Sequence, residues 1–170
     1  MIRPTRAVGV LSSAVIVVAM AARASMAQAP ANNACRLVTE SDLQSALGSK
    51  VTLKAGSIGD VQTCSGDTQS ARVLLRFFKR STDSSGKTEQ AGIDAIKKMG
   101  VQVDVKTSGG IMCMTAVPPA NMAAMGFGTT CTVTSKTPTF AVIEITTKTQ
   151  KDMVPMETLR AVAEKVASRF

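Results

Sequence analysis

A cluster of sulfur-containing side chains in the second half of the chain is the group whose residue types and spacing could do chemistry. Met112 and Met114 flank Cys113, and Met122 and Met125 follow within the same fourteen residues. Thioethers and thiolates are soft ligands that suit Cu(I), so one hypothesis is a soft-metal site. On a strand, however, Met112 and Met114 would point to one face and Cys113 to the other. We therefore favour flexible methionines that fill gaps in a core with few aromatic residues, and an apolar interaction surface is a third alternative.

Three arginines recur at every fourth residue of one apolar segment. On a strand, Arg72, Arg76 and Arg80 would project from one face, with Leu74 and Phe78 between them. Arginine interleaved with apolar side chains can bind an anionic polymer, a lipid headgroup surface or a partner that carries carboxylates. A simpler alternative is that a helix covers this face, with the arginine stems packed on the helix and their heads in water. This stripe is our first candidate for a binding surface.

The residue types that most enzymes need are missing or scattered. The chain has no histidine, which excludes Ser-His-Asp and Cys-His nucleophile systems and ordinary His-ligated zinc. Among the carboxylates only Glu144 lies in an apolar run, and a solvent-facing strand position explains it. The glycines at 109–110 and 126–128 are not followed by Gly-Lys-Ser/Thr, so they predict turns and no phosphate loop. We predict no catalytic residue and no cofactor, with a small hydrolase that uses carboxylates as an alternative.

Four cysteines, an even number, predict two disulfides in a protein exported to an oxidising compartment. Three connectivities are possible among Cys35, Cys64, Cys113 and Cys131, and the sequence does not choose between them. We favour Cys35–Cys64 and Cys113–Cys131, because each pair brackets a short stretch that can form one local unit. No C-x-x-C spacing occurs, so the cysteines are expected to be structural rather than redox-active.

The first residues have the three parts of a secretory signal peptide. Positive charge comes first, an apolar run follows over 7–22, and Ala27 and Ala29 provide a small-residue cleavage site. The apolar run is shorter than the roughly 20 residues of a membrane span. We predict a signal peptide at 1–29, cut after Ala27 or Ala29, and a single domain at 30–170 without a transmembrane span.

Composition restricts the class of protein further. Of the 170 residues, 45% are hydrophobic, 3% aromatic and 19% charged, which fits neither a disordered chain nor a polytopic membrane protein. Removing Arg3, Arg6 and Arg23 with the signal peptide lowers the net charge from +8 to +5. This excess favours anionic surfaces but lacks the clustered Lys and Arg of a nucleic-acid binder. We expect an envelope protein or an anionic surface component as the partner, and no nucleic acid.

An α+β domain must position these residues. Period-two alternation indicates strands, and apolar residues at i, i+3 and i+4 indicate helices. The strands are expected at 51–53, 61–64, 71–79, 101–107, 111–117, 129–135 and 139–147. The helices are expected at 40–47, 88–99 (apolar stripe Ala91, Ala95, Ile96 and Met99) and 155–170, with a helical turn at 121–125 and loops at 80–87 and 126–128. This order predicts a mostly antiparallel sheet of about five to seven strands with N-terminal, middle and C-terminal helices.

The opening of the predicted domain resembles a known pattern. Cys35-Arg36-Leu37-Val38-Thr39, Asp42-Leu43 and Ala46-Leu47-Gly48 are similar to the C-x-L-L-T…D…A-L-G start of small exported bacterial proteins, which include an uncharacterised family of actinobacterial lipoproteins. Cys64 and a C-terminal amphipathic helix that ends near Arg169 extend the resemblance. It implies an exported domain of this fold and no particular chemistry. The chain lacks the lipid-bearing cysteine at the cleavage site, so the resemblance does not imply a membrane tether.

The function we expect from the sequence is that of an exported, non-enzymatic binding or accessory domain of the bacterial cell envelope, periplasmic or secreted. Cu(I) binding through the methionine cluster at 112–125 is the first alternative. The carboxylate-dependent hydrolase is the second.

Overall fold

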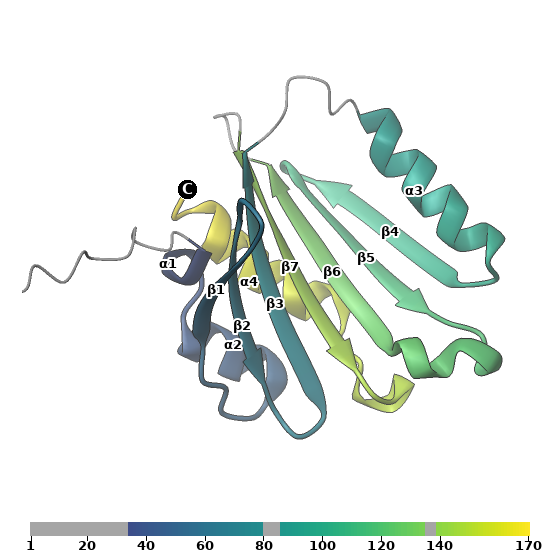
Figure 1. Ribbon diagram of the computed structural model, residues 1–170, viewed down its shortest axis with the longest axis horizontal. Helices are drawn as coiled ribbons and strands as arrows, with labels where there is room; N and C mark the ends of the chain where they lie inside the picture. The colour runs from purple at the N-terminus through teal and green to yellow at the C-terminus, as the bar shows by residue number, and fades with distance from the viewer. Residues whose placement is uncertain (1–33, 80–85, 135–138) are drawn as a thin grey trace, which may run out of the picture.

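Seven antiparallel strands form one sheet. The structure, a computed structural model, describes residues 34–79, 86–134 and 139–170. The strands are Lys54–Ile58 (β1), Val61–Asp67 (β2), Ala71–Lys79 (β3), Gln102–Ser108 (β4), Ile111–Val117 (β5), Phe127–Thr134 (β6) and Thr139–Thr147 (β7). They lie in the order β1-β2-β3-β7-β6-β5-β4, so that β3 and β7 pair near the middle of the sheet (Figure 1). The predicted α+β fold with a mostly antiparallel sheet is confirmed.

The helices lie on both sides of this sheet. They are Ala34–Leu37 (α1), Glu40–Leu47 (α2), Gly86–Lys98 (α3) and Met156–Ala167 (α4), with short 3₁₀ turns at Ala120–Met125 (η1) and Gln150–Asp152 (η2). In Figure 1 the C-terminal helix α4 crosses behind the sheet, and α3 runs beside β4 at the far edge. In the described parts of the chain, no helix has the length and apolar character needed to cross a membrane.

The core lies between the sheet and the helices α1, α2 and α4. Alternate residues of the strands point into it, as the period-two pattern predicts: Val73 and Leu75 of β3 are opposite Ile145 and Ile143 of β7, and all four are almost fully buried. The amphipathic stripe of α4 closes the core from the other side with Leu159, Val162, Ala163 and Val166.

Both disulfides have the favoured connectivity. Cys35 of α1 is bonded to Cys64 of β2, and Cys113 of β5 is bonded to Cys131, its direct partner across the β5–β6 ladder. Cys64, Cys113 and Cys131 are completely buried in the core. The structural role predicted for the four cysteines fits these positions, because one bridge attaches α1 to the sheet and the other links two neighbouring strands.

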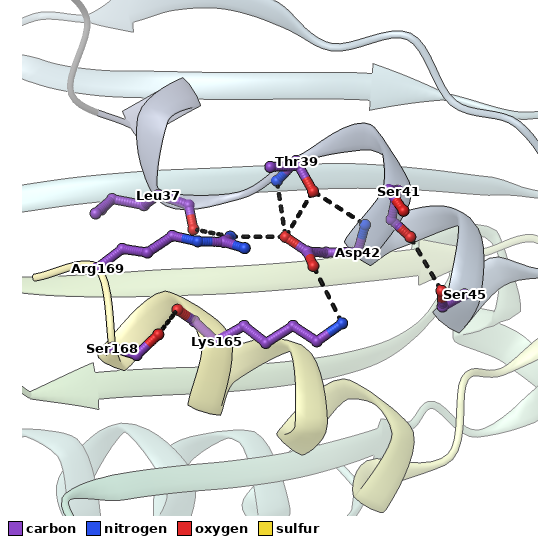
Figure 2. A network of polar contacts seen from close by, with 8 residues as sticks. All are labelled: Leu37, Thr39, Ser41, Asp42, Ser45, Lys165, Ser168 and Arg169. Atoms are coloured by element: carbon purple, nitrogen blue, oxygen red, sulfur yellow. Dashed lines mark hydrogen bonds and ion pairs between the residues drawn. The ribbon is translucent and has the colours of Figure 1, made fainter.

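A charged network joins the N-terminus of α2 to the end of α4 (Figure 2). Asp42 and Thr39 form a capping box at the start of α2, in which the Asp42 carboxylate accepts a hydrogen bond from the Thr39 backbone N–H. The same carboxylate accepts a 2.6 Å hydrogen bond from Arg169 and lies 3.1 Å from the Lys165 ammonium. Arg169 also donates to the carbonyl oxygen of Leu37 at 2.9 Å. This network attaches the C-terminus to the first two helices.

The structure differs from several of the predicted elements. The strand expected at 51–53 is instead β1, Lys54–Ile58, because this segment pairs with β2 across a two-residue turn despite its weak strand propensity. The loop expected at 126–128 is largely strand, since Phe127 and Gly128 pair with Thr147 and Thr146 of β7. The short helix α1 was not expected. The predicted signal peptide at 1–29, Arg80 and most of the loop at 80–87 lie outside the described residues.

Candidate binding groove

The face of the sheet opposite α4 carries the residues that alternate with the core. Met112 and Met114 of β5 lie on this face, as do Leu74 and Arg76 of β3, and all four are half-buried. The helix α3 lies over the β4 side of the same face. The short turn η1 borders the lower end of this face in Figure 1. We call this surface the open face.

A groove of about 460 Å³ lies between α3 and the open face. Ile93 and Ile96 of α3 form one wall, and Met112, Met114 and Ala116 of β5 contribute to the floor. Farther across the sheet the floor continues over Gly128, Thr130 and Thr132 of β6 and Val142, Glu144 and Thr146 of β7. The groove therefore crosses the strands, and its lining is mainly apolar on the α3 side.

Four methionines line this groove, but they are not the four that the sequence singled out. Met112, Met114 and Met125 are joined by Met99, which follows α3, whereas Met122 is not among the lining residues. Met99 and Met125 are 50% and 63% exposed. The favoured interpretation of the methionine cluster as core filling is wrong, because Cys113 points into the core to reach Cys131 and its two neighbours must face the other way.

The apolar stripe predicted for the middle helix is only partly right, because Ile96 and Met99 line the groove but the two alanines do not. Ala91 and Ala95 are exposed, whereas Ile93 is buried and Ile96 half-buried against the groove. The physical reason is that α3 rests on the open face near β4 rather than on the main core, so only a narrow apolar edge is covered. The isoleucines were visible in the sequence, but nothing in their spacing shows which face of the sheet they cover.

An ion pair lies at the end of the groove away from α3. Arg76 of β3 donates from Nη2 to Oε2 of Glu144 on β7 at 2.9 Å, and each side chain is 34% exposed. The Nε of Arg76 is buried and has no hydrogen-bond partner among the described residues. The guanidinium carbon lies 5.9 Å from the ring centre of Phe78, which in turn stacks on Phe140 at 4.7 Å. Glu144 thus lies on the face away from the core, as expected, but it is paired with Arg76 and only partly exposed to solvent.

A second hollow, of about 730 Å³, continues from the groove beyond this ion pair. Its lining is mixed: charged side chains of Asp67, Arg72 and Lys148 lie beside apolar ones such as Leu74 and Met125. Its lining shares four residues with the groove, namely Met125, Gly126, Glu144 and Thr146. The two spaces therefore adjoin along the open face.

The arginine stripe is only partly available for an anion. Arg72 lies 3.8 Å from the carboxylate of Asp67, with both side chains about 70% exposed, and Arg76 is paired with Glu144. Arg80 lies outside the described residues. Each arginine of the described part of the stripe therefore has a carboxylate neighbour, which weakens it as a purely cationic surface.

Two glycines shape the place where the hollows meet. Gly126 has φ +83°, and a β-carbon there would lie 2.6 Å from Cγ2 of Thr146, so a side chain at this position would be both strained and crowded. At Gly128, by contrast, a β-carbon would have no neighbouring atom within 4 Å. Glycine at position 128 therefore leaves space in the floor of the groove that a side chain would fill.

The groove has the features of a binding site for an apolar ligand with a polar end. Its walls are apolar, its charged groups are concentrated at one end, and the described residues contain no cluster of three His, Cys, Asp or Glu side chains that could hold a metal ion. Comparison with protein-family models, curated proteins and solved structures finds no match to this chain.

Proposed function

We propose that this chain is an exported, non-enzymatic binding domain of the bacterial cell envelope, and that its ligand occupies the groove between α3 and the open face. The observation that carries the proposal is the lining of the groove, with apolar side chains from α3 and β5 and one ion pair at the end. Small-molecule sites are concave and mostly apolar, with a few polar groups that orient the ligand. The volume of about 460 Å³ lies within their usual range of about 300–1,000 Å³.

Location outside the cytoplasm is supported by the covalent framework. All four cysteines are in disulfides, which persist in oxidising compartments. The signal-peptide pattern at 1–29 and the resemblance of the segment after Cys35 to exported bacterial proteins favour the envelope.

The hydrolase alternative has weaker support. Asp67 and Glu144 both line the second hollow, so two carboxylates do share one space. Each of them, however, has an arginine as its neighbour, Arg72 for Asp67 and Arg76 for Glu144. This pairing suits a charged binding surface better than a pair of carboxylates that would act together on a substrate.

The proposal is tested by binding of Nile red, a neutral apolar fluorophore, to the purified protein. The wild-type protein is expected to bind it, and Gly128→Val is expected to weaken binding at least about fivefold, because the added side chain projects into open groove space and overpacking a site costs about 1–3 kcal/mol. Valine also suits a strand, so the fold should persist.

The matched control is Ser57→Val, which adds valine to the exposed strand β1 outside both hollows. It should leave Nile red binding unchanged. Failure of the wild-type protein to bind the fluorophore, or equal binding by Gly128→Val, would contradict the proposal.

Cu(I) binding is a second candidate because four thioethers line one groove. An anaerobic Cu(I) titration distinguishes it from the first proposal. One equivalent of bound Cu(I) that is lost on replacing Met112 and Met114 with leucine would favour the metal site. Leucine keeps the volume of methionine closely, so this variant should lose less than about 1.5 kcal/mol of stability.

A further inference from the structure

We infer that the ligand of this groove is an amphiphile with one negative charge, whose apolar chain lies beside α3 and whose head group lies in the second hollow. This inference rests on the proposed binding function and deepens it. It joins the two adjoining spaces into one elongated site that crosses the open face from the β4 edge toward β3.

The polarity of the site changes along its length. At the α3 end the lining is apolar and includes Ile93, Ile96 and Met99. At the other end the lining is mixed, and Arg72 and Lys148 lie there among polar and apolar residues. A ligand that follows the site from end to end therefore needs an apolar chain and a polar head, since burying a polar group at the α3 end without a partner is costly.

The charged side chains that line the two spaces carry one net positive charge. Three cations, Arg72, Arg76 and Lys148, line the two spaces together with two carboxylates, Asp67 and Glu144. The carboxylates are paired with the two arginines, whereas the exposed Lys148 has no carboxylate partner among the described residues. A head group with a single negative charge matches this balance.

The floor of the site favours a hydrocarbon chain over an extended peptide. It is formed by β5, β6, β7 and β3, each of which pairs with a strand on both sides, so their backbone groups are already used in the sheet. A buried peptide backbone would find few partners there, and each unpaired polar group costs free energy. A hydrocarbon chain carries no such groups. The unbranched methionine side chains can also adapt to chains of different shape.

The experiment compares dodecanoate with dodecanol as competitors of bound Nile red, both below the concentrations at which they aggregate. We expect both to displace the fluorophore, and dodecanoate to do so at an about two- to fivefold lower concentration, the range for one exposed charge interaction. Lys148→Gln should remove most of this preference by weakening dodecanoate alone. High salt should act in the same direction, because exposed charges are screened.

The matched control is Lys54→Gln, which removes the same charge from β1, outside both spaces. It should keep the preference for dodecanoate. Equal displacement by the acid and the alcohol, with Nile red binding intact, would overturn the charged head group and leave the apolar groove standing. Displacement by an acidic amphipathic peptide but by neither dodecyl compound would overturn the amphiphile as the ligand. Absence of Nile red binding would overturn both the proposed function and this inference.

Discussion

Arg76 and Glu144 lie on two neighbouring strands near the centre of the sheet, at the junction of the groove and the second hollow. Leu74 lies directly opposite Glu144 in the ladder and Arg76 opposite Val142, so the ion pair is diagonal between the strands. Its half-buried setting reduces solvent screening relative to the pair Arg72–Asp67, which is about 70% exposed. Because both arginines belong to β3, the two pairs allow the effect of burial on an ion pair to be compared.

A double-mutant cycle should separate these two pairs. Truncation of Arg76 and Glu144 singly and together is expected to give a coupling of about 1 kcal/mol in the free energy of unfolding. The same cycle on Arg72 and Asp67 should give a coupling near zero, because the distance is 3.8 Å and both side chains are exposed. Urea unfolding at pH 7 provides the measurement. Equal couplings would show that burial does not distinguish the pairs.

Asp42 should make stability depend on acid pH. Burial alone would raise the pKa of this carboxyl, but hydrogen bonds from Arg169, Thr39 and Lys165 outweigh burial and hold the pKa well below its ordinary value. The folded state therefore binds the proton less readily than the unfolded state, so the stability that Asp42 contributes is present above the ordinary aspartate pKa of about 4 and is lost as the pH falls below it.

The measurement is the free energy of unfolding of the wild-type protein and of Asp42→Asn at pH values from 7 down to 2. At pH 7 the variant should be less stable by roughly 2 kcal/mol, since a hydrogen-bonded charge is replaced at a nearly buried position. Below pH 4 the difference between the two should shrink steadily as the pH approaches 2. A constant difference down to pH 2 would rule out this carboxylate as the source of the pH dependence.

At the scale of elements, the two disulfides have different tasks. The bridge between Cys35 and Cys64 closes 29 residues and holds the one-turn helix α1 on the sheet, whereas that between Cys113 and Cys131 closes 18 residues within paired strands. In the chain-entropy model their removal costs about 3.6 and 3.2 kcal/mol. The difference between the two loops is small, so their local surroundings decide which loss is greater.

Replacing each cysteine pair by alanine, one pair at a time, measures how much each disulfide stabilises the protein. We expect both double variants to lose about 3 kcal/mol or more in urea unfolding, and the variant without Cys35 and Cys64 to lose protection from hydrogen exchange in α1 first. Thiol titration of the denatured, unreduced wild-type protein should find no free thiol. A free thiol, or a peptide that links Cys35 to Cys131, would contradict the connectivity.

The helices and strands also show what local patterns can and cannot predict. Alternation in Ala71–Lys79 and Thr139–Thr147 is strong enough to predict both strands and their core faces. Lys54–Ile58 has no such alternation, since all five residues are exposed, and it is a strand only because β2 pairs with it. In β1, pairing with the neighbouring strand outweighs the weak strand propensity, and no residue of the segment predicts this pairing.

At the scale of the whole molecule, the candidate site depended on contacts that sequence spacing does not contain. Met112, Met114 and Arg76 were recognisable as unusual, and the face of each followed from its strand period. Their convergence required α3 to lie over the open face and β3 to pair with β7, which brings Glu144 to Arg76. Met99 lines the groove only because α3, which it follows, lies over the open face. Long-range packing, rather than local pattern, assembles the site.

The position of β3 beside β7 has a consequence for the order of folding. Lys79 pairs with Thr139, sixty positions further along the chain, while β1, β2 and β3 on one side and β4 to β7 on the other are each built from consecutive hairpins and neighbours. Neither disulfide crosses this seam, because one bridge lies on each side of it. Each half can thus be oxidised before the two meet. The closing of β3 on β7 has the longest loop of any strand pairing in the sheet, so we expect it to be the slow event of refolding. Until it occurs, the unpaired edge of β3 stays open to other chains.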